Sequence, residues 1–187
     1  YGAGGHASVV ADAITACGDK VVGYVDDVNP ERKCELFHGA PIIGGLDDLL
    51  GYRRIRNVEV AIGFGDCRAR RQLHEVLKRN GIQLITVIHP RAVVSAHAQI
   101  SEGGYIGPNA VVETDCVVGA CAIINCGATV CHGTTIGDYA AICPGVSIVG
   151  NCHIGNTTWG GIGTTIIEKI TVGEGCYIGA GAVVVGN

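Results

Sequence analysis

The feature of this sequence that most restricts its fold is a six-residue repeat that begins at Ile88 and continues to Val184. Within this stretch every sixth residue is isoleucine or valine, except at Gly160, which interrupts the series once. The residue after each aliphatic is often glycine, and the residue four positions after it is mostly small. The aliphatic series occupies positions 88, 94, 100, 106, 112, 118, 124, 130, 136, 142, 148, 154, 166, 172, 178 and 184.

This period excludes a helix and a single flat strand. Six residues rotate by about 600° around a helix axis, so an α-helix would spread the aliphatic residues over three faces. Short strands with a turn every six residues avoid this problem. Each backbone coil can pair with the coils above and below it at about 4.8 Å and stack its aliphatic side chains in the interior. The repeat therefore predicts a β-solenoid over residues 88–187, with turns that glycine assists.

Residues 1–87 carry a different pattern, in which helix-forming and strand-forming segments alternate. A strand is expected before the glycine turn, although Tyr1 is the only residue of it present, and Asp66 is expected to cap an arginine-rich helix. Alternation of this kind predicts a parallel sheet with crossover helices. We thus expect a small α/β domain at 1–87 and an all-β domain at 88–187 that is truncated at its C-terminal end. The expected segments are helices at 6–17 and 46–52 and strands at 20–25, 58–65 and 82–88.

Composition argues against several classes of partner. The net charge is −4 at pH 7 and no basic run occurs, so nucleic acid is not expected to bind. No apolar stretch approaches the roughly 18–20 residues of a membrane helix, and no secretory signal is found, so we expect no membrane association. Ten cysteines occur without a CxxC pair. Because Cys116, Cys152 and Cys176 fall at small apolar positions of the repeat, reduced core thiols are predicted, and with them a cytoplasmic protein.

The repeat resembles the hexapeptide of left-handed parallel β-helix acyltransferases. With "GAGGHA", "YVDD" and "AIGFG" before it and "INCGATVCHGTTIGDY" within it, nearly the whole chain resembles one subgroup. That subgroup contains sialic-acid O-acetyltransferases and bacillosamine or perosamine N-acetyltransferases. The resemblance implies an α/β Rossmann-like half-domain followed by a triangular β-helix, a homotrimer, and acetyl-CoA as cosubstrate between neighbouring prisms. It also implies N-acetylation of a nucleotide-activated amino sugar. O-acetylation of a sialic acid or related sugar is the alternative.

The glycine turn has two further interpretations. "GAGGHA" satisfies G-x-G-x-x-G/A and Asp26 follows His6 by 20 residues, which is typical of dinucleotide binding. However, residues 1–87 leave room for only one mononucleotide half, which can hold a nucleoside diphosphate at a helix N-terminus. A turn that only packs helix on strand is the other interpretation. The resemblance implies that the substrate-binding residues are Gly4, Gly5 and His6 for the diphosphate and sugar, Asp26 and Asp27 for the base, and Gly63 in the same cleft.

His132 is the candidate general base. It lies two positions past Val130, so its side chain is expected to point out of the solenoid. An outward histidine is most often only solvated, but the resemblance implies that this one is catalytic. A neutral imidazole, with an ordinary pKa of about 6.5, can take the proton that the acceptor loses when it attacks a thioester. Direct transfer needs no acyl-enzyme.

The sequence departs from the subgroup close to this histidine. Relatives commonly follow it with Asp or Glu, which orients the ring, whereas this chain has Gly133. Asn125, Glu113 or Asp115 are candidates to supply the missing support. A second histidine that touches acetyl-CoA in relatives is replaced by Ala141.

These departures keep a catalytically weak nucleotide-sugar-binding protein as an alternative. Ile162 and Ala180 match positions that contact acetyl-CoA, largely through the backbone. A zinc hydratase on the same solenoid would need several converging histidines, and the spacing of His132 and His153 is unsuited to joining a third ligand. No metal is therefore predicted.

Overall fold

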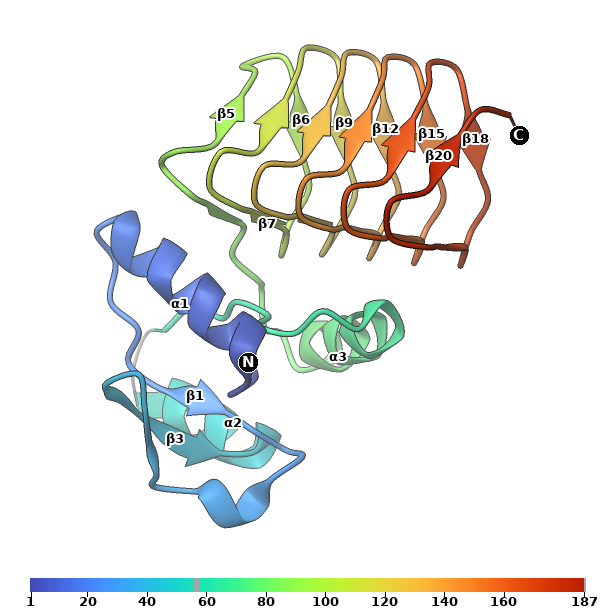
Figure 1. The fold of residues 1–187 in the computed structure, drawn as a ribbon. Helices are drawn as coiled ribbons and strands as arrows, with labels where there is room; N and C mark the ends of the chain where they lie inside the picture. The colour runs from blue at the N-terminus through green and yellow to red at the C-terminus, as the bar shows by residue number, and fades with distance from the viewer. Residues whose placement is uncertain (56–57, 187) are drawn as a thin grey trace.

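The computed structural model describes residues 1–55 and 58–186 and contains a small α/β domain beneath a prism of stacked β coils (Figure 1). In the prism, Ile124 pairs in parallel with Ile106 and with Ile142, so one coil spans 18 residues, or three hexapeptides. The strands form three parallel sheets, which we call faces I, II and III. Face I contains β4 (Val87–Ile88), β7 (Tyr105–Ile106), β10 (Ile123–Ile124), β13 (Ala141–Ile142), β16 (Trp159–Gly160) and β19 (Tyr177–Ile178).

Faces II and III continue each coil. We name an edge of the prism by the two faces that it joins along the chain, so edge I–II follows the strands of face I. Face II contains β5 (Val93–Val94), β8 (Val111–Val112), β11 (Thr129–Val130), β14 (Ser147–Ile148), β17 (Thr165–Ile166) and β20 (Val183–Val184). Face III contains β6 (Gln99–Ile100), β9 (Val117–Val118), β12 (Thr135–Ile136), β15 (His153–Ile154) and β18 (Thr171–Val172).

The second residue of each prism strand points inward, which confirms the interior column predicted from the repeat. Ile124, Val130 and Ile136, one from each face of a single coil, are at most 1% exposed. Small residues such as Ala128 and Cys116 occupy the remaining corners of the interior. Each face therefore contributes one inward aliphatic side chain per coil, and the pairing over 18 residues makes the cross-section three-sided.

The structure corrects the interpretation of the glycines. Left-handed backbone recurs every six residues, at the third position after the inward aliphatic. This position is occupied by glycine at Gly127 and Gly133 but by Tyr139 at the next step. The frequent glycines directly after the aliphatic do not adopt it. A Cβ on Gly137 would lie 2.6 Å from the backbone nitrogen of Asn156 in the next coil. These glycines permit close stacking of coils rather than the turn itself.

The α/β domain has a three-stranded sheet in the order β1-β3-β2, with β1 and β3 parallel and β2 antiparallel to β3. The β2–β3 hairpin was not predicted; its turn places His38 and Gly39 in left-handed backbone. Between the segments expected as strands at 58–65 and 82–88, the structure shows one isolated parallel bridge, which joins Val60 to Leu84. The elements are α1 (Gly5–Ala16), β1 (Tyr24–Val25), the 3-10 helix η1 (Pro30–Arg32), β2 (Leu36–Phe37), β3 (Ala40–Gly44), α2 (Leu46–Ile55) and α3 (Cys67–Arg79).

The prediction that Asp66 caps α3 is confirmed, because its Oδ1 accepts the N–H of Ala69 at 2.7 Å. The structure assigns no strand at Tyr1. Residues 1–2 still lie between two neighbouring segments, since Gly2 donates to Val25 O at 2.7 Å and Gly63 donates to Tyr1 O at 2.7 Å. No helix in the described residues is long and apolar enough to cross a membrane.

The α/β domain covers face I of the prism. Val10 and Ala13 of α1, with Cys67 at the start of α3, form one apolar cluster with Tyr105 and Ile123 of face I. Helices α1 and α3 both lie between the prism and the small sheet (Figure 1). Edge II–III is therefore on the side of the prism that faces away from the α/β domain of the same chain.

Candidate functional site

The glycine turn forms one open end of the α/β domain. Gly4 is the N-cap of α1, no side chain caps this helix, and its first turn contains no acidic residue. A Cβ on Gly4 or Gly5 would meet no atom within 4 Å, so both glycines border open space. Uncapped amides at a helix N-terminus favour a phosphate. This end of α1 therefore has the geometry needed to hold a diphosphate.

The two aspartates at the end of β1 lie beside this turn, but their carboxylates already accept protein hydrogen bonds. Asp26 accepts from the backbone N–H groups of Val28 and Asn29 at 3.0 and 3.1 Å and lies 3.5 Å from Arg32. Burial would raise the pKa of Asp26, but the hydrogen bonds from Asn29 and Val28 and the charge of Arg32 outweigh it and lower that pKa. Asp27 accepts from Leu46 N at 2.9 Å. Contact of either carboxylate with a base stays a prediction.

Gly63 lies against the start of α1. A Cβ on Gly63 would be 2.7 Å from the Cα of Ala7, so only glycine allows this approach. A cavity of about 390 Å³ opens beside Gly63 and Tyr1 and is lined by segments 19–25 and 58–61 and by one side of α1, including Ala7 and Val10. Gly4, Gly5 and His6 do not line it. This cavity is therefore distinct from the open space at the N-terminus of α1.

His6 connects the turn to the prism. Its ring meets that of Tyr105 edge to face, with centroids 5.3 Å apart, and its Nε2 atom and the Tyr105 hydroxyl are both buried without a hydrogen-bond partner in the described structure. Burial, followed by the charge of Arg70, lowers the pKa of His6 to about 4. His6 is therefore neutral at physiological pH. Tyr105 was not singled out from the sequence, although its place before Ile106 marks it as an outward residue of face I.

His132 points outward from edge II–III, as predicted, with 59% of its side chain exposed. Glu113 lies one coil earlier, and its Oε2 accepts the backbone N–H of His132 at 2.8 Å and lies 3.3 Å from Nδ1 of the ring. These hydrogen bonds lower the pKa of Glu113. On the other side, a Cβ on Gly150 would be 2.6 Å from His132 Nε2, so the ring lies directly over that glycine. The imidazole is thus held between two neighbouring coils.

The structure assigns ring support to Glu113 among the candidates considered. Gly133 has φ 66°, and a Cβ there would lie 2.5 Å from Asn151 Oδ1, so this position is a turn residue of the repeat. Asn125 lies on edge I–II, where its Oδ1 accepts the N–H of Cys126 at 2.8 Å. The expectation that Asn125 supports His132 is therefore wrong within one chain, because the two residues lie on different edges.

The residues expected to contact acetyl-CoA lie on another edge from His132. Ile162 is 61% exposed on edge I–II, and its carbonyl accepts the N–H of Gly181 next to Ala180 in the following coil. Ala141 is buried on face I, where the α/β domain covers the prism. Ile162 and Ala180 thus stack on edge I–II, and face II separates them from His132.

The cysteines of the described chain are free thiols, and several of them are buried. Burial raises the pKa of Cys121 to about 12 and that of Cys143 to about 11. Within residues 1–55 and 58–186, no group of three or more His, Cys, Asp or Glu side chains is arranged to hold a metal ion. The histidine–glutamate pair on edge II–III and the open turn of α1 are the two places with suitable chemistry.

Comparison with known proteins places the chain among sugar acetyltransferases. Residues 1–77 match the family model of the PglD N-terminal domain. Structures of perosamine N-acetyltransferase from Caulobacter crescentus in complex with CoA and GDP-perosamine superpose with a TM-score of 0.94 at 32% identity, covering 100% of this chain and 87% of that one. They include variants in which one histidine is replaced by asparagine or alanine.

Two curated relatives agree with this comparison. GDP-perosamine N-acetyltransferase of Escherichia coli O157:H7 is 27% identical over an alignment of 121 residues, with coverage of 56% of this chain and 55% of the relative. UDP-N-acetylbacillosamine N-acetyltransferase of Bacillus subtilis strain 168 is 35% identical over an alignment of 109 residues, with coverage of 56% of this chain and 48% of the relative. The chain spans about half the length of the curated relatives it matches.

Proposed function

The chain belongs to the hexapeptide-repeat sugar acetyltransferase family, whose left-handed β-helix it shares, and on this premise we propose that it transfers the acetyl group of acetyl-CoA to the amine of a nucleotide-activated amino sugar. The observation that carries the proposal is the His132–Glu113 pair on an exposed prism edge. The open N-terminus of α1 supports a nucleotide-linked acceptor rather than a free sugar.

His132 is the proposed general base. A carboxylate can only accept a hydrogen bond, so Glu113 favours the tautomer with the proton on Nδ1 and leaves the lone pair on Nε2. Acetyl-CoA supplies the thioester. Nε2 takes the proton that the attacking amine loses and returns it to the departing thiolate, which balances the reaction without a cysteine nucleophile. The raised pKa values of the buried thiols agree with direct transfer.

The α/β domain at 1–87 is proposed to bind the acceptor. Backbone amides at Gly4 and Gly5 face the diphosphate, and neutral His6 borders the sugar. Asp26 and Asp27 hold the base once their present partners rearrange, and Gly63 keeps the strand close enough to α1 to form the cleft. The prism at 88–187 contributes the catalytic edge.

We propose a homotrimer because one chain alone does not complete this site. The glycine turn lies at face I, His132 lies on the remote edge II–III, and Ile162 and Ala180 lie on edge I–II. A neighbouring prism is needed to bring residues from two different edges to one acetyl-CoA, and closed cyclic symmetry meets this need for every copy equally.

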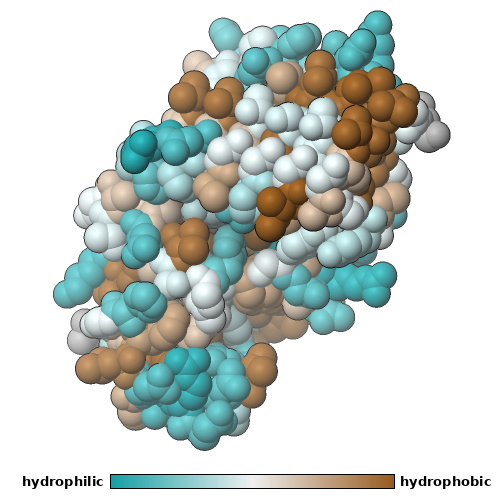
Figure 2. Space-filling view, viewed as in Figure 1, coloured by the Kyte–Doolittle hydropathy of each residue, from teal (hydrophilic) through white to brown (hydrophobic). Residues whose placement is uncertain are grey.

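The surfaces of faces II and III suit such contacts. The outward residues of face II carry no charge, and the part of the prism that bears β5 to β20 shows few strongly hydrophilic residues in its middle (Figure 2). Interface cores are depleted in charged residues. Light scattering is expected to give three times the chain mass of 19.2 kDa, and a monomer that retains full turnover would contradict the shared site.

The activity is tested with acetyl-CoA and a panel of acceptors that includes GDP-perosamine, UDP-linked 4-amino sugars and a free sialic acid. Release of the CoA thiol together with an N-acetylated sugar nucleotide is the expected result. Acetylation of the sialic acid hydroxyl alone would replace the proposal with O-acetylation, and nucleotide binding without any thiol release would indicate a catalytically weak binding protein.

The role of His132 is tested by replacing it with alanine. We expect His132→Ala to lose about 100-fold or more in kcat, a typical contribution of general base catalysis, with GDP or UDP affinity unchanged. His38→Asn, at the exposed left-handed turn of the β2–β3 hairpin, is the matched control and should retain activity. Equal turnover of both variants would assign the base elsewhere.

A further inference from the structure

Arg70 is the most deeply buried charged side chain of the described chain, and it connects the two domains. Although it belongs to the basic helix α3, it is only 1% exposed. Its Nε donates to Cys121 O at 3.0 Å, and its Nη2 donates to Tyr139 O at 2.6 Å and to Ala140 O at 3.1 Å. Nη1 also donates to Gly65 O. One guanidinium thus binds two successive coils of the prism and the loop that precedes α3.

The carbonyls that Arg70 binds explain why an arginine is needed here. Cys121 and Tyr139 are left-handed turn residues on edge III–I of successive coils. A lysine has one terminal nitrogen and cannot reach four separated oxygens, whereas the planar guanidinium carries five donors in fixed directions. No salt bridge joins Arg70 to a carboxylate in the described structure; its N–H groups donate to backbone carbonyls and, at 3.7 Å, to the Cys67 thiol. Such an arrangement is costly to disturb, because an unpartnered buried charge is strongly unfavourable.

The loop held by Arg70 leads directly to the proposed acceptor site. Gly65 follows Gly63, which contacts Tyr1 and Ala7 beside the glycine turn. The charge of Arg70 is also near enough to His6 to lower its pKa. Arg70 therefore touches the prism on one side and the support of the glycine turn on the other.

We propose that Arg70 is a positioning residue that fixes the orientation of the α/β domain on its own prism, so that the bound acceptor is presented to the catalytic edge of a neighbouring chain. This inference rests on the proposed function, because it assumes that the glycine turn holds the acceptor. Loosening the domain contact should leave nucleotide binding within the α/β domain largely intact. It should lower turnover, because transfer depends on placing the amine within about 3–3.5 Å of the reacting carbon.

The single tryptophan gives a readout that does not depend on activity. Trp159 lies on face I, is partly buried, and packs against the apolar cluster between the domains. A Cβ on Gly65 would lie 3.9 Å from its ring, so the tryptophan borders the loop that Arg70 holds. Opening of the domain contact should therefore expose Trp159 to a soluble quencher such as acrylamide.

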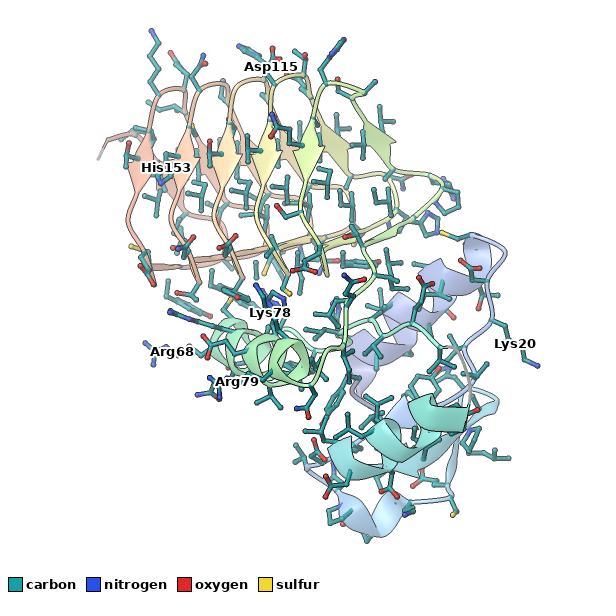
Figure 3. All side chains as sticks on the ribbon, turned by 180° about the vertical axis from the view of Figure 1, so that it is seen from behind. Lys20, Arg68, Lys78, Arg79, Asp115 and His153 are labelled. Atoms are coloured by element: carbon teal, nitrogen blue, oxygen red, sulfur yellow. The ribbon has the colours of Figure 1, made fainter. Side chains whose placement is uncertain are left out.

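The experiment compares Arg70→Met with Arg68→Met, a matched control on the same helix. Arg68 is exposed and extends outward from α3 (Figure 3). Arg70→Met is expected to raise the acrylamide quenching constant of Trp159 by about twofold and to lower kcat by about tenfold, with the Kd for GDP or UDP changed by less than about twofold. Arg68→Met should match the unmodified protein in all three measurements. Arg70→Lys, which keeps the charge, should recover part of the kcat, and it carries the test if Arg70→Met does not fold.

Each outcome decides the inference. Quenching and kcat that match those of Arg68→Met would overturn it. Increased quenching with unchanged kcat would show that Arg70 joins the domains without positioning the acceptor. A proportional loss of kcat and of nucleotide-binding sites would indicate a smaller folded fraction and would also overturn it. If the unmodified protein shows no turnover with any acceptor, the proposed function fails, and the quenching comparison still decides whether Arg70 holds the domains together.

Discussion

Glu113 contacts His132 through both the backbone and the ring, so one carboxylate fixes the position of the main chain and the tautomer of the side chain. Because its pKa is lowered by these hydrogen bonds, the carboxylate remains ionised at neutral pH. In relatives an acidic residue next to the histidine is expected to orient the ring. Here Gly133 occupies the left-handed turn position, and the acidic residue comes from the preceding coil.

Replacing Glu113 should therefore impair catalysis without removing the histidine. Glu113→Gln keeps an oxygen that can accept the backbone N–H but also presents an NH2 group to the ring, so the tautomer is no longer fixed. We expect kcat to fall by about tenfold or more, by analogy with the loss of a carboxylate that orients a catalytic histidine, with little change in the KM for acetyl-CoA. Steady-state kinetics at pH 7.5 measure both quantities.

Asp115→Asn provides the comparison for this charge change. Asp115 is an exposed carboxylate on the same edge, in the coil of Glu113, and it points away from the α/β domain (Figure 3). The substitution removes the same charge two residues away and should leave kcat within about twofold. Similar losses in both variants would mean that general electrostatics of the edge, and not the contact with the ring, supports catalysis.

At the scale of the strand, each two-residue prism strand has one inward and one outward side chain, and only the inward one should contribute strongly to stability. Strand β9 allows a matched test, because Val118 is fully buried and Val117 is 36% exposed. Val118→Ala is expected to lower the free energy of unfolding by about 2 kcal/mol, from two lost methyl groups and the cavity they leave. Val117→Ala should cost less than about 1 kcal/mol.

Urea unfolding followed by circular dichroism measures this difference. Both variants make the same chemical change on adjacent residues of one strand, so the propensity of alanine for a strand cancels in the comparison. A larger loss for Val117→Ala would mean that the outward surface of face III is covered by another chain under the conditions of the experiment. The pair therefore also reports on the proposed contact between prisms.

At the scale of the whole molecule, the prism could be predicted because its rule is local and repeated. The series around Ile124 requires only that every sixth side chain points inward. Contacts that join distant segments could not be predicted in the same way. The Glu113–His132 hydrogen bond spans 19 residues and follows only once a coil is known to contain 18, which the six-residue period alone does not determine.

The α/β domain was less predictable for a related reason. Nothing in the arginine-rich pattern of α3 distinguishes buried Arg70 from exposed Arg68, because the difference depends on carbonyl groups 51 and 69 residues further along the chain. The β2–β3 hairpin was missed because its turn uses His38 in left-handed backbone, which is uncommon for residues other than glycine. Only the tertiary contacts identify these positions.

The neutral histidine between the two domains predicts how stability depends on pH. Burial lowers the pKa of His6 to about 4, whereas an unfolded histidine has a pKa of about 6.5. Between these values the unfolded chain binds a proton that the folded chain does not, so the free energy of unfolding decreases as the pH falls through about 6.5 and the loss is complete below about 4. The shift corresponds to about 3 kcal/mol.

Replacing His6 with asparagine removes this term, because asparagine does not titrate. Between pH 7.5 and pH 4.5 the unmodified protein should lose about 2–3 kcal/mol more than His6→Asn, measured by urea unfolding at each pH. His38→Asn, an exposed histidine of the same domain, should retain the full pH dependence. The opposite outcome is that His6→Asn and the unmodified protein lose the same free energy of unfolding on acidification. His6 would then be protonated in the folded protein, and its buried contact with Tyr105 between the two domains would be wrong.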